Sequence, residues 1–224
     1  MSLVSHLKWQ NLVFFQLEKK LHTDKTLQKS YSDFMHEYES LGHMEAVGQS
    51  EHSSHPSHYI PHLAVLREDS STTKVRVVFN ASAKTSSGLA LNDGLMVGPT
   101  IQGDIFSILS RFRLHRYVLT ADIEKMYRQI NVHQSNQDLQ RILWRKNKDS
   151  PIQIYRLKTV TYGTASAPYL AIRTLNQVAQ DEKGRYPLAS KIVQRDFYVD
   201  DLLMGSDSLE ETKLIQTKIE CIRK

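Results

Sequence analysis

Phe197-Tyr198-Val199-Asp200-Asp201-Leu202-Leu203-Met204 is the stretch that decides how the rest of the chain is interpreted. Two adjacent carboxylates stand between two short apolar runs, each long enough for one strand, and the pair has the length of a tight hairpin turn. We therefore predict a buried hairpin with Asp200 and Asp201 at its tip. Two neighbouring negative charges repel each other unless a cation lies between them, and oxygen-only ligands suit a hard ion such as Mg2+. Taken alone, the pair favours an ordinary solvated Asp-Asp turn, and the rest of the chain decides between the two interpretations.

The composition sets wide bounds on the class of protein. The 224 residues allow one large domain or two small ones, and 40% hydrophobic residues permit a sizeable core. A net charge of +5 suits a nucleic-acid partner without requiring one. The single cysteine, Cys221, excludes an internal disulfide framework and fits a reducing compartment. We find no apolar run long enough for a membrane span and no signal-peptide pattern.

The N-terminal part of the chain is predicted to be helical over residues 1–44. Apolar residues recur at helical spacing over residues 8–21, and a second helix is expected from the N-cap residues Thr23-Asp24 to Gly42. These helices could form an arm that binds a nucleic acid or a partner. We favour the simpler interpretation, in which the helical pair packs on the main domain.

A polar linker is predicted over residues 45–58, because this stretch is rich in serine, glycine and proline. The linker and its downstream flank carry four histidines, whose spacing loosely suggests a metal site: His52, His55, His58 and His62. No cysteine or acidic residue completes a tetrahedral set, so we do not favour a zinc site.

The remainder, residues 59–224, mixes predicted strands and helices. Strands are expected at 59–66, 75–79, 117–122, 139–144 and 152–157, and helices at 101–114, 165–180 and 208–223. The strand 117–122 is predicted to be buried and ends in Asp122. If it neighbours the Asp200-Asp201 hairpin in one sheet, three carboxylates meet at one place. With two Mg2+ ions about 3.5–4 Å apart, such a cluster forms a site for phosphoryl transfer.

Several motifs follow one another along the chain: Tyr59-Ile60-Pro61-His62-Leu63-Ala64-Val65, Lys74-Val75-Arg76-Val77-Val78-Phe79-Asn80-Ala81-Ser82, Leu91-Asn92-Asp93-Gly94-Leu95-Met96-Val97-Gly98-Pro99, the segment from Thr120 to Ile130, Ala167-Pro168-Tyr169-Leu170-Ala171-Ile172-Arg173-Thr174-Leu175 and Phe197-Tyr198-Val199-Asp200-Asp201. In this order they resemble the reverse transcriptase of BEL/Pao-type LTR retrotransposons, and the resemblance covers about residues 10–224. It implies an α+β fold: a right-hand polymerase with an antiparallel palm sheet, covering helices and fingers, preceded by the helical N-terminal segment.

The resemblance also implies roles for particular residues. Asp122 and Asp200 would be the main metal ligands, with Asp201 as the third carboxylate and the backbone carbonyl of Ile123 as a further contact. The cofactors would be two Mg2+ ions, with Mn2+ as a possible substitute. The alternative for Asp200 and Asp201 is a solvated turn.

The incoming nucleotide would meet other positions of the motifs. Arg76, together with Lys74, would contact the triphosphate. Tyr127 would lie under the sugar and exclude a 2′-hydroxyl, although the same residue could be an ordinary core tyrosine. The pair Tyr162-Gly163 would line the nucleotide pocket; the family usually has Phe at the first position. Asn80 stands where the family often has Asp.

The implied activity is that of an RNA-directed DNA polymerase acting on an RNA template, an RNA–DNA hybrid and dNTPs. Phosphate contacts are expected from basic residues, chiefly Arg111, Arg113, Arg116, Arg128 and Arg145, and also Arg141, Lys146 and Lys148. The chain would be a truncated part of an intracellular, cytoplasmic Pol polyprotein without its thumb, ribonuclease H and integrase. The alternatives are a non-catalytic remnant that at most binds nucleic acid, and another palm-type nucleotidyl transferase or cyclase.

Overall fold

The computed structural model describes residues 3–48, 56–66 and 75–222. The chain divides into two compact units, each made from two stretches of sequence. The first unit comprises Met1–Met96 and Tyr127–Ala167, and the second comprises Val97–Met126 and Pro168–Lys224. Within the described residues, no helix combines the length and the apolar character needed to cross a membrane.

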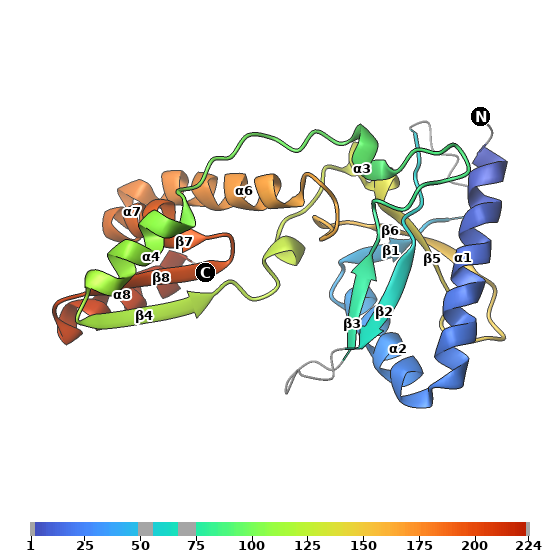
Figure 1. Ribbon diagram of the computed structural model, residues 1–224, viewed down its shortest axis with the longest axis horizontal. Coiled ribbons are helices and arrows are strands. Elements are labelled where there is room, and N and C mark those ends of the chain that lie inside the picture. Colours follow the sequence, from blue (N-terminus) through green and yellow to red (C-terminus); the bar gives the residue numbers. More distant parts are fainter. Residues whose placement is uncertain (1–2, 49–55, 67–74, 223–224) are drawn as a thin grey trace. The chain divides into compact units, whose positions relative to one another are not determined.

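Two helices open the first unit, as the sequence predicts (Figure 1). Helix α1 (Leu3–Thr23) extends beyond the predicted range at both ends, and α2 (Lys25–Ser40) begins directly after it. The carboxylate of Asp24 accepts hydrogen bonds from the backbone amides of Thr26 and Leu27, so it caps α2 in the way the sequence indicates.

The strands of the first unit form two antiparallel sheets. One has the order β1 (Met44–Ala46), β6 (Gln153–Leu157), β5 (Arg141–Trp144), and the other pairs β2 (His62–Leu66) with β3 (Val75–Phe79). Short helical segments connect them: α3 (Leu91–Gly94), η1 (Met126–Gln129), α5 (Gln134–Gln137) and η2 (Asp138–Gln140).

A shared hydrophobic core joins both helices of the first unit to both of its sheets. Its buried members include Phe14, Leu17 and Leu21 of α1, Leu27, Tyr31, Met35 and Tyr38 of α2, and Val77, Phe79, Ile142, Trp144, Tyr155 and Leu157 of the strands. The prediction that the helical pair packs on the main domain is therefore confirmed. β1 lies at the start of the predicted linker, and residues 49–55 of that linker are outside the described residues.

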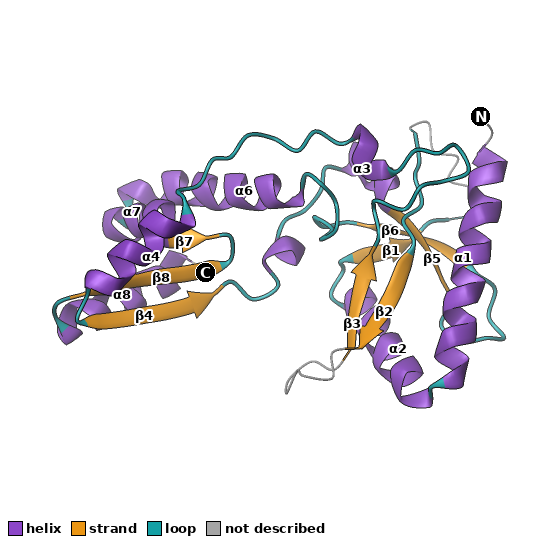
Figure 2. Cartoon of the chain, viewed as in Figure 1, coloured by secondary structure: helices purple, strands orange, loops and turns teal. Residues whose placement is uncertain are grey.

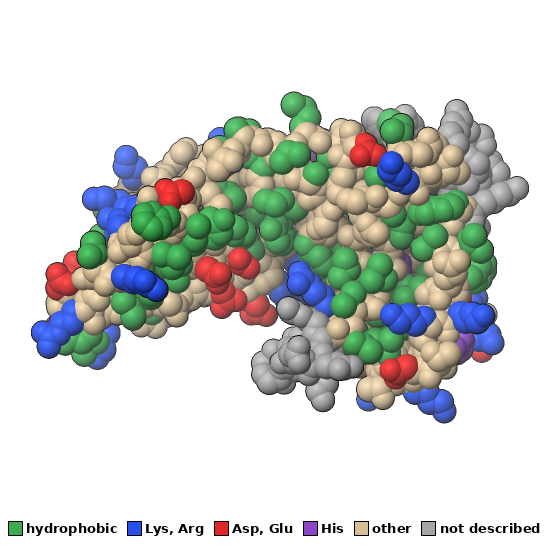
Figure 3. Space-filling view, in the orientation of Figure 1, with side chains coloured by type: hydrophobic (Ala, Val, Ile, Leu, Met, Phe, Trp, Pro, Cys, Tyr) green, Lys and Arg blue, Asp and Glu red, His purple; other side chains and the backbone are tan. Residues whose placement is uncertain are grey.

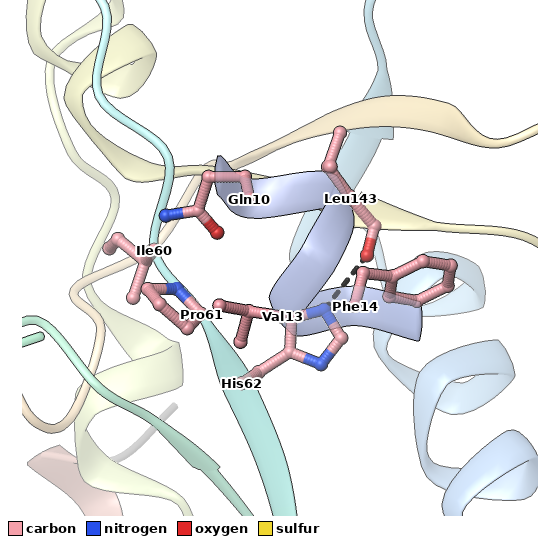
Figure 4. Close-up of a pocket in the computed structure, with 7 residues that line it drawn as sticks. All are labelled: Gln10, Val13, Phe14, Ile60, Pro61, His62 and Leu143. Atoms are coloured by element: carbon pink, nitrogen blue, oxygen red, sulfur yellow. Dashed lines mark hydrogen bonds between the residues drawn. The ribbon is translucent and has the colours of Figure 1, made fainter. Parts of the chain in front are cut away.

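His62 lies in this core, in a small pocket formed by α1, β5 and the start of β2 (Figure 4). Its Nε2 is 2.9 Å from the Leu143 carbonyl, which can only accept a hydrogen bond, so Nε2 carries the proton. Its Nδ1 then accepts from the Tyr31 hydroxyl at 2.7 Å. Burial lowers the pKa of His62 to about 4. His62 is thus a neutral core residue, while His52 and His55 lie outside the described residues.

The second unit is built on a sheet with the strand order β4 (Tyr117–Asp122), β8 (Asp201–Ser206), β7 (Phe197–Tyr198). Helices α4 (Ile105–Leu114), α7 (Pro187–Asp196) and α8 (Leu209–Ile222) contact this sheet (Figure 2). Helix α6 (Ala167–Asp181) runs into η3 (Glu182–Gly184). A small core fills the space between sheet and helices and consists of Ala189, Ile192, Leu202, Met204, Ile215 and Ile219.

Two features of the second unit differ from the sequence-based expectation. The strand ending in Asp122 was predicted to be buried, but among the described strands β4 pairs with β8 alone, and its Val118 is 51% exposed. Its apolar composition indicates a strand correctly but cannot tell an edge from a centre. In addition, no helix was predicted at α7, although Pro187 at its first turn is a typical helix start.

Candidate active site

The hairpin between β7 and β8 forms, but its turn lies one residue earlier than predicted. Tyr198 pairs with Asp201, so Val199 and Asp200 make the turn and Asp201 begins β8. Val199 has a φ of 57°, while Asp200 has no positive φ, which is the pattern of a type II′ turn. The Val199 amide donates a hydrogen bond to Oε1 of Gln102, 3.1 Å away, which ties the turn to the segment before α4.

Strand β4 brings the third carboxylate to this hairpin. Its antiparallel register with β8 places Asp122 directly opposite Asp201. One residue further, the amide of Ile123 donates to the carbonyl of Asp200 across 2.9 Å. The backbone therefore fixes all three acidic residues at one end of the sheet, as the sequence predicts. In the space-filling view, acidic side chains gather over the end of β4 and the β7–β8 turn (Figure 3).

The chemistry of these donors suits a hard divalent cation. Asp122 and Asp201 are exposed, Asp200 is partly exposed, and all three offer oxygen atoms alone. The described residues include no group of three His, Cys, Asp or Glu side chains already gathered for a metal ion. The backbones of the three aspartates are thus adjacent in the sheet, but their carboxylate groups are not gathered, and a bound ion would have to draw these groups together. The Ile123 carbonyl accepts from the Met126 amide at 3.2 Å and has a second lone pair available.

In the first unit, the predicted nucleotide-binding residues surround β3. Arg76 lies on β3, with its guanidinium 5.8 Å from the centre of the Tyr162 ring. The Tyr162 hydroxyl donates to the Val77 carbonyl at 2.7 Å, and burial raises the pKa of that hydroxyl to about 12. Gly163 has a φ of 98°, and a Cβ at this position would collide with the carbonyl oxygen of Phe79. Lys74 lies outside the described residues.

Asn92 is a residue to which sequence reasoning assigned no role. Its side-chain nitrogen donates to the hydroxyl of Ser82 at 2.8 Å and to the carbonyl of Gly163 at 3.0 Å. Its side-chain oxygen accepts from the Ala165 amide at 2.8 Å. One amide therefore fastens the Tyr162-Gly163 segment to the chain that leaves β3. The sequence signal that could have identified Asn92 is its place in the motif that runs from Leu91 to Pro99.

Comparison with known proteins shows the family to which this chain belongs. The model of the family described as reverse transcriptase (RNA-dependent DNA polymerase) matches residues 57–224, which is more than half of the chain. This chain belongs to the reverse transcriptase family. No curated protein matches its sequence.

Solved structures support the fold of this reverse transcriptase domain. Similar structures include the protease–reverse transcriptase of prototype foamy virus, as a selenomethionine-labelled mutant with a TM-score of 0.65 and in native form with a TM-score of 0.62. Both are 14% identical to this chain and cover 89% and 88% of it. The chain spans 22% of the length of each of these proteins. The predicted α+β polymerase fold is confirmed.

The basic residues predicted to bind nucleic acid fall into two groups. Several are engaged in ion pairs: Arg111 with the buried Asp196, Arg128 with Glu37, Arg141 with Asp138, Arg145 with Glu18 and Lys146 with Glu39. Arg113, Arg116 and Lys148 are exposed. Because an engaged guanidinium has fewer hydrogens left for a phosphate, we expect phosphate contacts first from the exposed group. All of these contacts remain predictions.

Tyr127 and Arg128 lie in η1, which begins four residues after the last residue of β4. Tyr127 is partly buried, and its carbonyl is 3.4 Å from the amide of Ile130. The Arg128 guanidinium lies 4.8 Å from the ring centres of both Phe34 and Tyr38, on α2. The segment predicted to contact the sugar is therefore attached to the N-terminal helices.

Proposed function

We propose that this domain is the fingers-and-palm core of an RNA-directed DNA polymerase from a BEL/Pao-type LTR retrotransposon. One observation carries the proposal: Asp122, Asp200 and Asp201 meet at one end of a sheet in a chain that matches the reverse transcriptase family. The ordered motifs quoted above support the BEL/Pao assignment.

In the proposed reaction, the 3′-oxygen of a primer bonds to the α-phosphorus of a dNTP, and pyrophosphate leaves. We assign Asp122, Asp200 and the Ile123 carbonyl to two Mg2+ ions, or Mn2+ in their place, with Asp201 as the third carboxylate. When bound, these ions would activate the hydroxyl and neutralise charge on the departing pyrophosphate. The chain's own contribution is to fix the backbone positions of the three aspartates in advance, through the hydrogen bond from Ile123 to Asp200 and the β4–β8 register.

The nucleotide and template contacts follow from the same motifs. We assign Arg76 and Lys74 to the triphosphate, Tyr127 to exclusion of a 2′-hydroxyl, and Tyr162-Gly163 to the nucleotide pocket. The exposed position of Arg76 on β3 supports its assignment, since a phosphate can reach it. The exposed basic residues Arg113, Arg116 and Lys148 would hold the RNA template and the RNA–DNA hybrid, and the other parts of a Pol polyprotein would be partners.

Primer extension on an RNA template with Mg2+ tests the proposal. The wild-type chain should extend the primer with dNTPs, EDTA should stop extension, and Asp200→Asn should lose about two orders of magnitude in rate or more. Asp207→Asn is a matched control, because it removes an exposed carboxylate just beyond β8 and should change little. Equal rates for wild type and Asp200→Asn would overturn the catalytic assignment. Absence of extension by the wild type, beside an active retroviral enzyme, would overturn the polymerase proposal itself.

A further inference from the structure

The side chain of Arg128 links the segment that follows β4 to helix α2. Arg128 stands next to Tyr127 in η1, and its guanidinium lies over both the Phe34 and the Tyr38 ring. Its Nη1 is 3.4 Å from Oε1 of Glu37. These three partners occur at i, i+3 and i+4, so they form one face of α2. The contact thus joins η1 to a single continuous surface of the N-terminal helices.

That surface of α2 is itself fixed in the core of the first unit. Tyr38 is fully buried and its ring lies 5.8 Å from that of Phe79 on β3, while Phe34 packs beside it with ring centres 5.5 Å apart. The positive charge of Arg128 opposes the rise that burial causes in the pKa of the Tyr162 hydroxyl. Because Phe34, Glu37 and Tyr38 hold the Arg128 guanidinium, its position is defined, and so is the position of η1.

The environment of Arg128 favours a structural tie over a nucleic-acid contact. Its side chain is 11% exposed, whereas Glu37 on the outer side is 46% exposed. Its guanidinium carbon lies 4.8 Å from the centres of two aromatic rings that are themselves 5.5 Å apart, so both rings contact it from one side through the partial negative charge of their faces. Little of the group is left open to a phosphate.

We propose that Arg128 is a positioning residue through which α2 fixes Tyr127, so that the N-terminal helices take part in nucleotide selection. This inference rests on the proposed polymerase function and on the assignment of Tyr127 to the sugar. If Tyr127 excludes the 2′-hydroxyl by its position, then releasing η1 from α2 allows the ring to move away. Selection against ribonucleotides should fall, while binding of the primer–template should not.

The test compares Arg128→Met with Arg156→Met. Arg156 is a suitable match: it lies in the same unit, is 14% exposed and pairs with Glu45 on a neighbouring strand. The first measurement is hydrogen exchange of the peptide covering residues 126–130, which requires no activity. Arg128→Met should accelerate exchange there by about tenfold, the order expected for loss of a cation–π contact, whereas Arg156→Met should not.

The second measurement is the ratio of kcat/KM for a dNTP to that for the matching rNTP. Arg128→Met should lower this ratio by about tenfold with unchanged primer–template affinity, and Glu37→Gln should lower it by a smaller factor. Unchanged exchange at 126–130, or an unchanged ratio, would overturn the proposal. Weaker primer–template binding with a reduced salt dependence would instead assign Arg128 to a phosphate. Failure of the polymerase proposal would appear separately, as absence of extension by the wild type, while hydrogen exchange would still decide whether the tie exists.

Discussion

Replacement of His62 should make the stability of the first unit less dependent on pH. The imidazole is enclosed by Phe14, Tyr31 and Phe79, with ring centres about 6 Å away, and both of its nitrogens are hydrogen-bonded. A proton added at Nδ1 would place a charge in this apolar site and remove the acceptor for the Tyr31 hydroxyl. Burial therefore lowers the pKa of His62 from its ordinary 6.5 to about 4.

The sign and the size of the effect follow from this difference. Below pH 6.5 the unfolded chain binds a proton at His62 and the folded chain does not, so protonation favours unfolding. The stability that comes from the neutral imidazole is complete above pH 6.5 and is lost as the pH falls towards 4. The full difference corresponds to about 3 kcal/mol, of which about 2 kcal/mol is lost by pH 5.

Urea unfolding followed by tryptophan fluorescence measures this loss, because Trp9 and Trp144 both lie in the first unit. Acidic groups also titrate in this range, so the informative quantity is the difference between wild type and His62→Gln, which retains a donor for the Leu143 carbonyl. The advantage of the wild type at pH 7.5 should shrink by about 2 kcal/mol at pH 5. A difference that stays constant over this range would refute the argument that His62 is neutral in the folded state.

Two further predictions concern the segment around Tyr162. Gly163→Ala should lower the free energy of unfolding of the first unit by about 3 kcal/mol, because a Cβ there would collide with the Phe79 carbonyl and the φ of residue 163 is 98°. Gly94→Ala serves as the control in the same urea assay, because the space around Gly94 is open. Asn92→Ala should lower the free energy of unfolding by about 1–3 kcal/mol and speed hydrogen exchange at residues 163–165, because it removes three hydrogen bonds. Unchanged exchange at these residues would show that the Asn92 side chain does not hold the segment in place.

The sequence identifies most elements of the fold because local signals act over a few residues. The cap at Asp24, the first turn of α6 with its Pro168 and the cap at Ser208 all depend on contacts within one helical turn. Long-range partners leave no such signal. Arg145 pairs with Glu18, which is 127 residues away in the sequence, so a cluster of basic residues in sequence does not reveal which of them are engaged in the fold.

The active-site hairpin illustrates the same limit at the scale of one residue. Sequence alone predicts a hairpin around the two carboxylates and a strand that ends in Asp122, because apolar runs flank them, and it brings the three together only if the strand and the hairpin are neighbours in one sheet. It does not predict that Val199 enters the turn, since a β-branched residue at positive φ is unfavourable and Gly or Asn is expected there. The register of β4 on β8, and the bond from Ile123 to Asp200, accompany this strained conformation. This backbone conformation places Asp200 in the turn and Asp201 on β8, where it lies opposite Asp122. Strain at Val199 and the adjacency of the carboxylates are therefore two aspects of one backbone arrangement.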